Sequence, residues 1–236
     1  MTHHLSYLAR WAIGAVALTA ATVSCRSSTA AQPSRTVAFQ VRGNAAAFAT
    51  AASSGPLAIT SVRIVVDGAA LGSGDQYGCV DCQGNNGELA ATPAQVISVP
   101  LDGGTALVTT ERVSVGTYRQ IEISLDVPSA ALVAANPGWP ANATIMVTGS
   151  YNGTSFTLPL AIAGSFRQSL SPPLNVAANA TSGALAVHLT LPIASWFTWN
   201  GAPLNPADAT QRAQIEANAR AAFQSTDVAE SSATER

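Results

Sequence analysis

The chain has 236 residues, of which 47% are hydrophobic and only 10% are charged. Eleven arginines, no lysine and thirteen acidic residues leave a formal net charge of −2. This balance lacks the basic surface that nucleic acids require, so we predict no nucleic-acid partner. The apolar content excludes a disordered chain and is sufficient for one sizeable domain.

The first 25 residues have the layout of an export signal. A short start that ends at the basic Arg10 is followed by an uncharged run over 11–23 and then by small residues. The apolar run is shorter than the roughly 20 residues that span a bilayer. We therefore predict that residues 1–24 are a cleaved signal peptide and that the protein is exported.

Cys25 is the candidate lipidation site. The segment Thr22-Val23-Ser24-Cys25 resembles the lipobox of bacterial lipoproteins, with Thr22 in place of the usual leucine. Acylation of Cys25 would anchor the protein to the cell envelope, and residues 25–34 would form a flexible tether. The alternative is cleavage by an ordinary signal peptidase near Ala31, which would release a secreted protein.

Alternation of apolar and polar residues with period two predicts about eight strands after the tether. The predicted strands are 36–41, 59–66, 96–101, 106–108, 116–127, 144–151, 154–160 and 184–191. Asn152-Gly153 is a strong hairpin signal, because a two-residue type I′ turn requires positive φ at both positions and Asn and Gly adopt positive φ readily. We predict an all-β fold over residues 35–195, an immunoglobulin-like or transthyretin-like antiparallel β-sandwich.

The strand over 116–127 has the clearest alternation in the chain. Its predicted inward face carries Arg119, Ile121, Ile123, Leu125 and Val127. The opposite face is predicted to be solvated and carries Tyr118, Gln120, Glu122, Ser124 and Asp126.

Residues 196–236 are predicted to form a C-terminal helical extension with a frayed tail. Asn205 can cap the helix, Pro206 suits its first position, and Asp208 favours the positive end of the helix dipole. The residues predicted to share its buried face are Ile215, Ala219, Ala222 and Phe223.

Several segments are similar to a family of exported bacterial proteins, the domain of unknown function 4382. The segments that carry the resemblance are Ile59 to Val66, Val96 to Leu101, Val115 to Ile123, and Leu191 to Phe197 with Gly201, Leu204-Asn205-Pro206 and Ile215 to Asn218. The resemblance implies a β-sandwich in the envelope and no particular chemistry. Asn205 replaces the Asp of the family's "lDP" motif, which argues against cation binding at that turn.

Cys79 and Cys82 lie in a glycine-rich loop and are predicted to form a disulfide, because the cell envelope is oxidising. A thioredoxin-like redox site is an alternative, but the glycine-rich surroundings show no strand–helix unit to support it. Zinc would need further ligands that the sequence does not place nearby. Asp75, Asp81 and Glu88 are weak candidates for calcium, since the regular spacing of a calcium loop is absent.

No residue set points to catalysis. His188 is the only histidine after the signal peptide, and the chain has no G-x-S-x-G motif. Glu111, Glu122 and Asp126 could supply a carboxylate pair for glycoside hydrolysis, but the last two fit a solvated strand face better.

The aromatic residues allow two interpretations. Trp139, Trp196, Trp199 and Tyr151 could form a platform on which sugars stack. For most of these residues the expected role is structural, with Trp196, Phe197 and Trp199 packing in the core or docking the C-terminal segment. We therefore predict a non-enzymatic, lipid-anchored β-sandwich without a cofactor, with a binding or structural role. Its partners would be the membrane and a glycan or another envelope protein. The alternative is an envelope redox or metal-binding protein that uses the Cys79–Cys82 loop.

Overall fold

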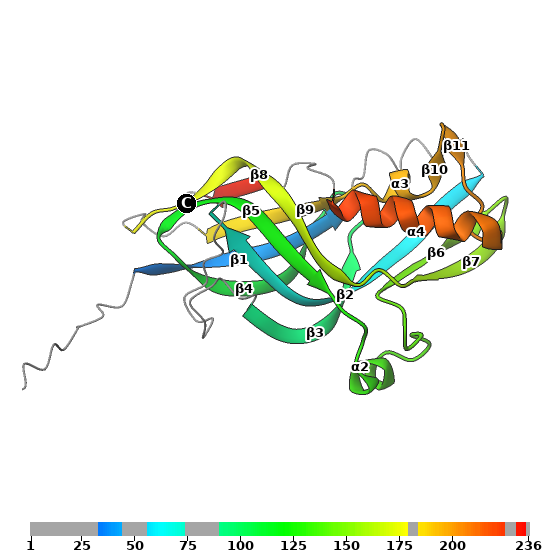
Figure 1. The fold of residues 1–236 in the computed structure, drawn as a ribbon, viewed down its shortest axis with the longest axis horizontal. Coiled ribbons are helices and arrows are strands. Elements are labelled where there is room, and N and C mark those ends of the chain that lie inside the picture. The colour runs from blue at the N-terminus through cyan, green and yellow to red at the C-terminus, as the bar shows by residue number, and fades with distance from the viewer. Residues whose placement is uncertain (1–32, 44–55, 74–89, 179–183, 225–229, 235–236) are drawn as a thin grey trace, which may run out of the picture. The chain divides into compact units, whose positions relative to one another are not determined.

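β-Strands dominate the structure, and a helix follows them near the C-terminus, as the sequence predicts (Figure 1). The computed structural model describes residues 33–43, 56–73, 90–178, 184–224 and 230–234, all within the unit Gln32–Arg236. The predicted signal peptide and most of the tether lie outside the described residues, as do the predicted site residues Cys25, Cys79, Cys82, Asp75, Asp81 and Glu88.

The first sheet has the strand order β12-β9-β1-β4. Its strands are β12 (Glu230–Thr234), β9 (Ala184–Leu191), β1 (Ser34–Gly43) and β4 (Ala106–Ser114). β1 pairs with β4 in the antiparallel sense but with β9 in the parallel sense. The expectation of a purely antiparallel sandwich is therefore wrong at this pair. The long chain between β1 and β9 makes the parallel crossover feasible.

The second sheet is built around β2 (Leu57–Gly72), the longest strand in the described part of the chain. Its other strands are β3 (Ala90–Val99), β5 (Gly116–Leu125), β6 (Ile145–Tyr151), β7 (Thr154–Leu160) and β8 (Gly164–Val176). β2 lies between β3 and β6 at Val62–Ile64, and between β3 and β5 at Gly68 and Ala69. β6 and β5 thus follow one another along the same edge of β2.

The inward faces of both sheets form one hydrophobic core. Val37, Phe39 and Val41 of β1 are buried on one face, as the alternation predicts. They belong to the same cluster as Ile64 of β2 and Ile123 of β5, so side chains of the two sheets pack against each other. This arrangement is a β-sandwich, and removal of these side chains from water supplies most of the favourable folding free energy.

A smaller cluster covers the outer face of β2. Val65, Trp139 and Met146 are buried there and pack against Leu132 and Val133 of α2 (Ala130–Ala135). The Trp139 Nε1 donates a hydrogen bond of 2.8 Å to the Ala143 carbonyl oxygen. β2 is consequently buried on both faces over much of its length, which explains why Asp67 is the one charged residue of this strand after Arg63.

An irregularity in strand pairing breaks the alternation of side chains at the start of β5. The pairing of β5 with β8 shifts register between Tyr118 and Gln120. As a result Tyr118 is buried in the core, where its hydroxyl donates to the Ser114 carbonyl oxygen at 2.9 Å, and Arg119 is exposed. The predictions for these two residues are wrong because the pairing skips Arg119 on β5 and residues 170–173 on β8, which interrupts the period of two. Burial also raises the pKa of the Tyr118 phenol.

Glu122 is buried, although the alternation predicts a solvated position. Its Oε2 accepts a hydrogen bond of 2.9 Å from Nε of Arg167, directly opposite on β8. Asp126, which lies beyond the end of β5, is exposed as predicted, and Val127 is half-exposed outside the core. β8 itself was not predicted from the sequence.

The C-terminal part of the chain forms two helices with a small hairpin between them. These elements are α3 (Ile193–Trp196), β10 (Thr198–Trp199), β11 (Ala202–Pro203) and α4 (Ala209–Gln224). α4 begins after Asp208, later than predicted, because the Asn205 side chain accepts from the Ala207 N–H in a separate turn. None of the helices in the described residues has the length and apolar character to cross a bilayer.

Candidate functional site

The strongest candidate site is a shallow hollow of about 490 Å³ between α4 and the α3–β10–β11 segment. These elements lie side by side at one end of the sandwich (Figure 1). We call it the Trp199 hollow, and it is lined by Pro192, Ser195, Thr198, Trp199, Asn200, Asn218, Ala221 and Ala222.

A tight hairpin presents Trp199 to solvent. Asn200 and Gly201 connect β10 to β11 with φ angles of 49° and 78°, the left-handed conformation that a two-residue hairpin turn requires. Trp199 pairs with Ala202 in this hairpin and is 51% exposed. The short strand therefore holds a large aromatic ring in a fixed exposed position.

Asn218 of α4 ties the helix to the wall of the hollow. Its Nδ2 donates to the carbonyl oxygens of Trp196 at 3.1 Å and Thr198 at 3.0 Å. Its Oδ1 accepts a hydrogen bond of 2.7 Å from Gln214 Nε2. These bonds attach the backbone on both sides of Phe197 to α4. They therefore hold the hairpin that carries Trp199 against the helix.

The floor beneath this region is a cluster of aromatic rings. Phe223 of α4 packs against Trp196, with ring centroids 5.9 Å apart, and against Phe166 of β8, at 5.1 Å. Ile215, Ala219, Ala222 and Phe223 are all buried, so the helical face predicted from the sequence is confirmed. The Trp199 hollow thus stands on a rigid part of the core.

The polar atoms of the hollow are mainly hydrogen-bond acceptors. The Ser195 hydroxyl donates to the Pro192 carbonyl oxygen at 2.7 Å, and the Thr198 hydroxyl donates to the Ala194 carbonyl oxygen at 3.1 Å. Since each hydroxyl hydrogen is already used, the oxygen lone pairs remain to accept from a ligand. Among the described residues that line the hollow, none is charged.

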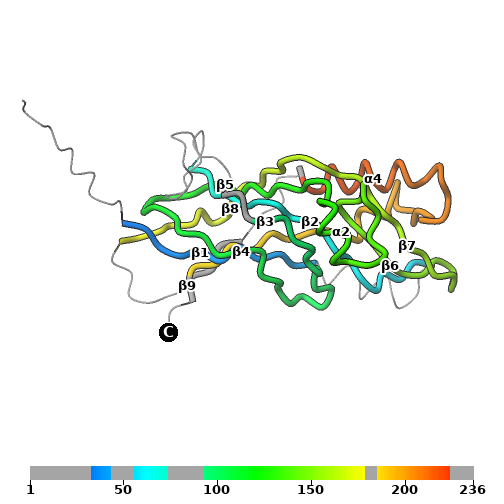
Figure 2. Tube along the Cα trace, turned by 90° about the horizontal axis from the view of Figure 1, so that it is seen from below, coloured from blue at the N-terminus to red at the C-terminus, as the bar shows by residue number. Residues whose placement is uncertain are grey.

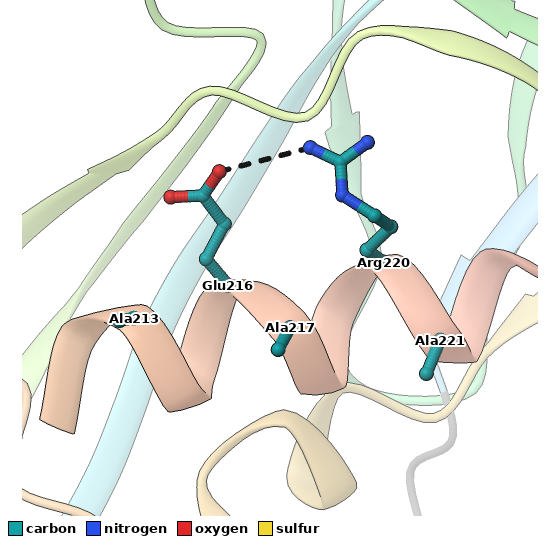
Figure 3. Close-up of a pocket in the computed structure, with 5 residues that line it drawn as sticks. All are labelled: Ala213, Glu216, Ala217, Arg220 and Ala221. Atoms are coloured by element: carbon teal, nitrogen blue, oxygen red, sulfur yellow. Dashed lines mark ion pairs between the residues drawn. The ribbon is translucent and has the colours of Figure 1, made fainter.

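A second hollow of about 450 Å³ lies on the neighbouring face of α4 and shares Ala221 with the first. Its lining is Ala213, Glu216, Ala217, Arg220 and Ala221 (Figure 3). Glu216 and Arg220 form an ion pair of 3.7 Å along the helix. Arg220 also reaches the carbonyl oxygens of Ala161 and Ala163, so this face supports α4 and its charges are already paired.

The four aromatic candidates do not form a common platform. Trp139 and Trp196 are buried at 4% and 0% exposure, and Tyr151 lies in β6 at the other hairpin. Only Trp199 among the tryptophans of the described residues is exposed. Core packing is thus confirmed for Trp196 and Phe197 and wrong for Trp199.

The carboxylate candidates also lie apart in the fold. Glu111 belongs to β4 of the first sheet and accepts from the Thr109 hydroxyl at 2.9 Å, whereas Glu122 belongs to β5 of the second sheet. His188 is half-buried in β9. Within the described ranges, no group of three or more His, Cys, Asp or Glu side chains could hold a metal ion.

Sequence reasoning missed Ser195, Thr198, Asn200 and Asn218 as members of a site. The available signal was Asn200-Gly201, the same dipeptide that predicts the hairpin at Asn152-Gly153.

No family model matches the chain, and searches of curated proteins and of solved structures found no significant match. The resemblance to the domain of unknown function 4382 therefore stays a prediction.

Proposed function

We propose that this chain is an exported, lipid-anchored, non-enzymatic protein of the bacterial cell envelope that binds a ligand in the Trp199 hollow. The observation that carries the proposal is the exposed indole of Trp199 on a rigid hairpin. Tryptophan is enriched at binding interfaces because it combines a large apolar ring with a polar N–H, and Trp199 is half-exposed beside a hollow.

The position of the hollow relative to the predicted anchor supports the proposal. β1 begins at Ser34, where the predicted tether ends, and its last residue Gly43 pairs with Leu191 of β9. Leu191 leads directly into α3 and the hollow. Because a strand advances about 3.3 Å per residue, the tether and the hollow are separated by roughly 30 Å. Figure 2 displays the start of β1 and helix α4 at opposite ends of the sandwich.

This separation matters for a protein held by lipid at its N-terminus. A ligand site beside the anchor would lie against the bilayer, whereas a site at the far end of β1 has room for a ligand while the lipid stays inserted. The proposal therefore combines a predicted lipid on Cys25 with a site at the end of the domain opposite the tether.

Two structural expectations belong to the same proposal. The sandwich is of the immunoglobulin-like or transthyretin-like kind, which two facing, mainly antiparallel sheets support. Cys79 and Cys82 form a short-range disulfide, because both would lie in an oxidising compartment.

The anchor is tested with the full chain in a bacterial host. We expect the wild-type protein to sediment with membranes and its mature N-terminus to carry the mass of acyl chains on Cys25. The variant Cys25→Ser should lose the acyl chains and leave the membrane fraction, whereas the matched control Cys79→Ser should stay membrane-bound. An unmodified wild-type N-terminus would overturn the anchored part of the proposal.

A further inference from the structure

We infer that the Trp199 hollow is a binding site for a neutral saccharide. This inference rests on the proposed function, because it names the ligand class of the same hollow. It follows from the aromatic surface, the polar atoms and the absence of charge in the lining.

The aromatic surface comes from Trp199. A sugar ring presents a face of C–H groups on one side and hydroxyls around its edge. An exposed indole offers a flat apolar face of matching size, and its burial under such a ring removes apolar area from water at little cost in conformational entropy. Trp199 is 51% exposed, so a ring can still cover much of it.

The polar atoms beside Trp199 match the edge of a sugar. The hydroxyl oxygens of Ser195 and Thr198 have donated their hydrogens to main-chain carbonyls and are left as acceptors. Ligand hydroxyls are donors that can satisfy them. The side-chain amide of Asn200, at the tip of the hairpin, offers both a donor and an acceptor.

Charge decides between saccharide classes. The part of the lining that the structure describes contains no Arg, Lys, Asp or Glu, so a phosphate or carboxylate on the ligand would find no charged partner among these residues. The nearest charged residues on α4, Glu216 and Arg220, line the neighbouring hollow and pair with each other. A neutral ligand is therefore favoured over an acidic polysaccharide.

The site is also prepared before a ligand arrives. Asn218 already holds the carbonyls of Trp196 and Thr198, and the Asn200-Gly201 turn sets the direction of Trp199. A ligand then meets a surface that needs little ordering, which lowers the entropic cost of binding.

The test uses the full mature chain and a defined set of probes. Cellohexaose, maltohexaose and chitohexaose represent neutral saccharides, and an oligogalacturonate of the same length represents acidic ones. Binding is measured by calorimetry and by acrylamide quenching of tryptophan fluorescence. Since Trp139 and Trp196 are buried, quenching in the folded protein reports chiefly on Trp199. We expect at least one neutral hexasaccharide to bind and to protect Trp199 from the quencher.

Two variants test the position of the site. Trp199→Ala should weaken binding by about tenfold or more, as truncation of an aromatic anchor commonly does. Leu107→Ala is the matched control, because Leu107 is 56% exposed but lies on β4, and it should bind like the wild type.

Three results would overturn the inference: no binding of any neutral probe, tighter binding of the acidic probe, or undiminished binding by Trp199→Ala. Such a failure is distinct from a failure of the anchored part of the proposed function. Membrane anchoring through Cys25 is measured independently, and an anchored protein that binds no saccharide would leave the anchor intact.

Discussion

The side-chain amide of Asn218 donates a hydrogen bond of 3.0 Å to the main-chain carbonyl oxygen of Thr198, twenty residues earlier in the chain. The same amide reaches the Trp196 carbonyl oxygen, so one side chain on α4 holds the segment that leads into the β10–β11 hairpin. The position of Trp199 thus depends on a residue of a different element, which connects the stability of α4 to the shape of the hollow.

Replacement of Asn218 by Ala should destabilise the protein by about 1 kcal/mol, because the part-buried carbonyl oxygen of Trp196 and the exposed one of Thr198 lose their donor. Urea unfolding checks the change in the free energy of unfolding. Gln214→Ala is the matched control, since it removes the bond to Asn218 Oδ1 and leaves both donated bonds in place. Equal losses in the two variants would contradict the assigned role of the Asn218 amide.

Arg167→Ala should destabilise the protein more than Glu122→Gln. The Glu122 side chain is 7% exposed and the Arg167 side chain 59%, so loss of the arginine leaves a buried carboxylate, whereas loss of the carboxylate leaves a cation that water can reach. We expect about 1–3 kcal/mol for Arg167→Ala. In a double-mutant cycle measured by urea unfolding, Glu122→Gln should restore part of the loss, and a double variant as unstable as Arg167→Ala would refute the asymmetry.

Gly149→Ala should destabilise the pairing of β2 with β6. A methyl group at Gly149 would overlap the Ala58 carbonyl oxygen and lie 3.0 Å from the Phe156 ring. Overpacking of this kind costs about 1–3 kcal/mol, which thermal and urea unfolding can measure. Gly116→Ala is the control, because the nearest atom to its added methyl is 3.8 Å away in the Tyr118 ring. A stable Gly149→Ala variant would mean that β2 and β6 lie farther apart than described.

Asp208 should make the stability of α4 depend on pH. Hydrogen bonds from the Thr210 hydroxyl at 2.7 Å and the Thr210 N–H at 2.8 Å lower the pKa of the Asp208 carboxyl. Because the pKa is lower in the folded state, the ionised carboxyl stabilises the fold at pH values above the ordinary Asp pKa of about 3.9. This stabilisation is lost as the pH falls through the folded-state pKa.

The variant Asp208→Ala should therefore have a lower melting temperature than the wild type at pH 6, and the difference should shrink towards pH 2. Asp208→Asn is the control, because its side-chain oxygen keeps the capping acceptor without titrating. An NMR titration should give Asp208 a pKa below the ordinary range. A pH-independent difference between Asp208→Ala and wild type would contradict a role for ionisation.

Strands with one buried face were predictable from the sequence. β1 alternates because Val37, Phe39 and Val41 face the core, and the β6–β7 hairpin was evident from Asn152-Gly153. β8 escaped prediction because Gln168 occupies an inward position and Pro172-Pro173 interrupts the pattern. The parallel pairing of β1 with β9 also escaped, since alternation does not specify which strand lies alongside.

The candidate site was only partly predictable. The tryptophans were conspicuous, but the sequence could not distinguish Trp196, which is fully buried, from Trp199, three residues later and half-exposed. Their difference arises because α4 packs over Trp196 through Phe223, whereas the Asn200-Gly201 turn directs Trp199 outward.

Where the alternation or the helical period is unbroken, the sequence by itself determined which side chains share a face. The strand period of two and the helix period of 3.6 are local properties of the backbone, so Ile215, Ala219, Ala222 and Phe223 could be placed together without knowledge of their partners. Only the tertiary structure decided which faces are covered. Glu122 is buried because Arg167, 45 residues away, closes over it, and the Trp199 hollow exists because Asn218 meets the carbonyls of a distant segment. Burial depends on the element that lies across from a residue, and that element is set by long-range packing.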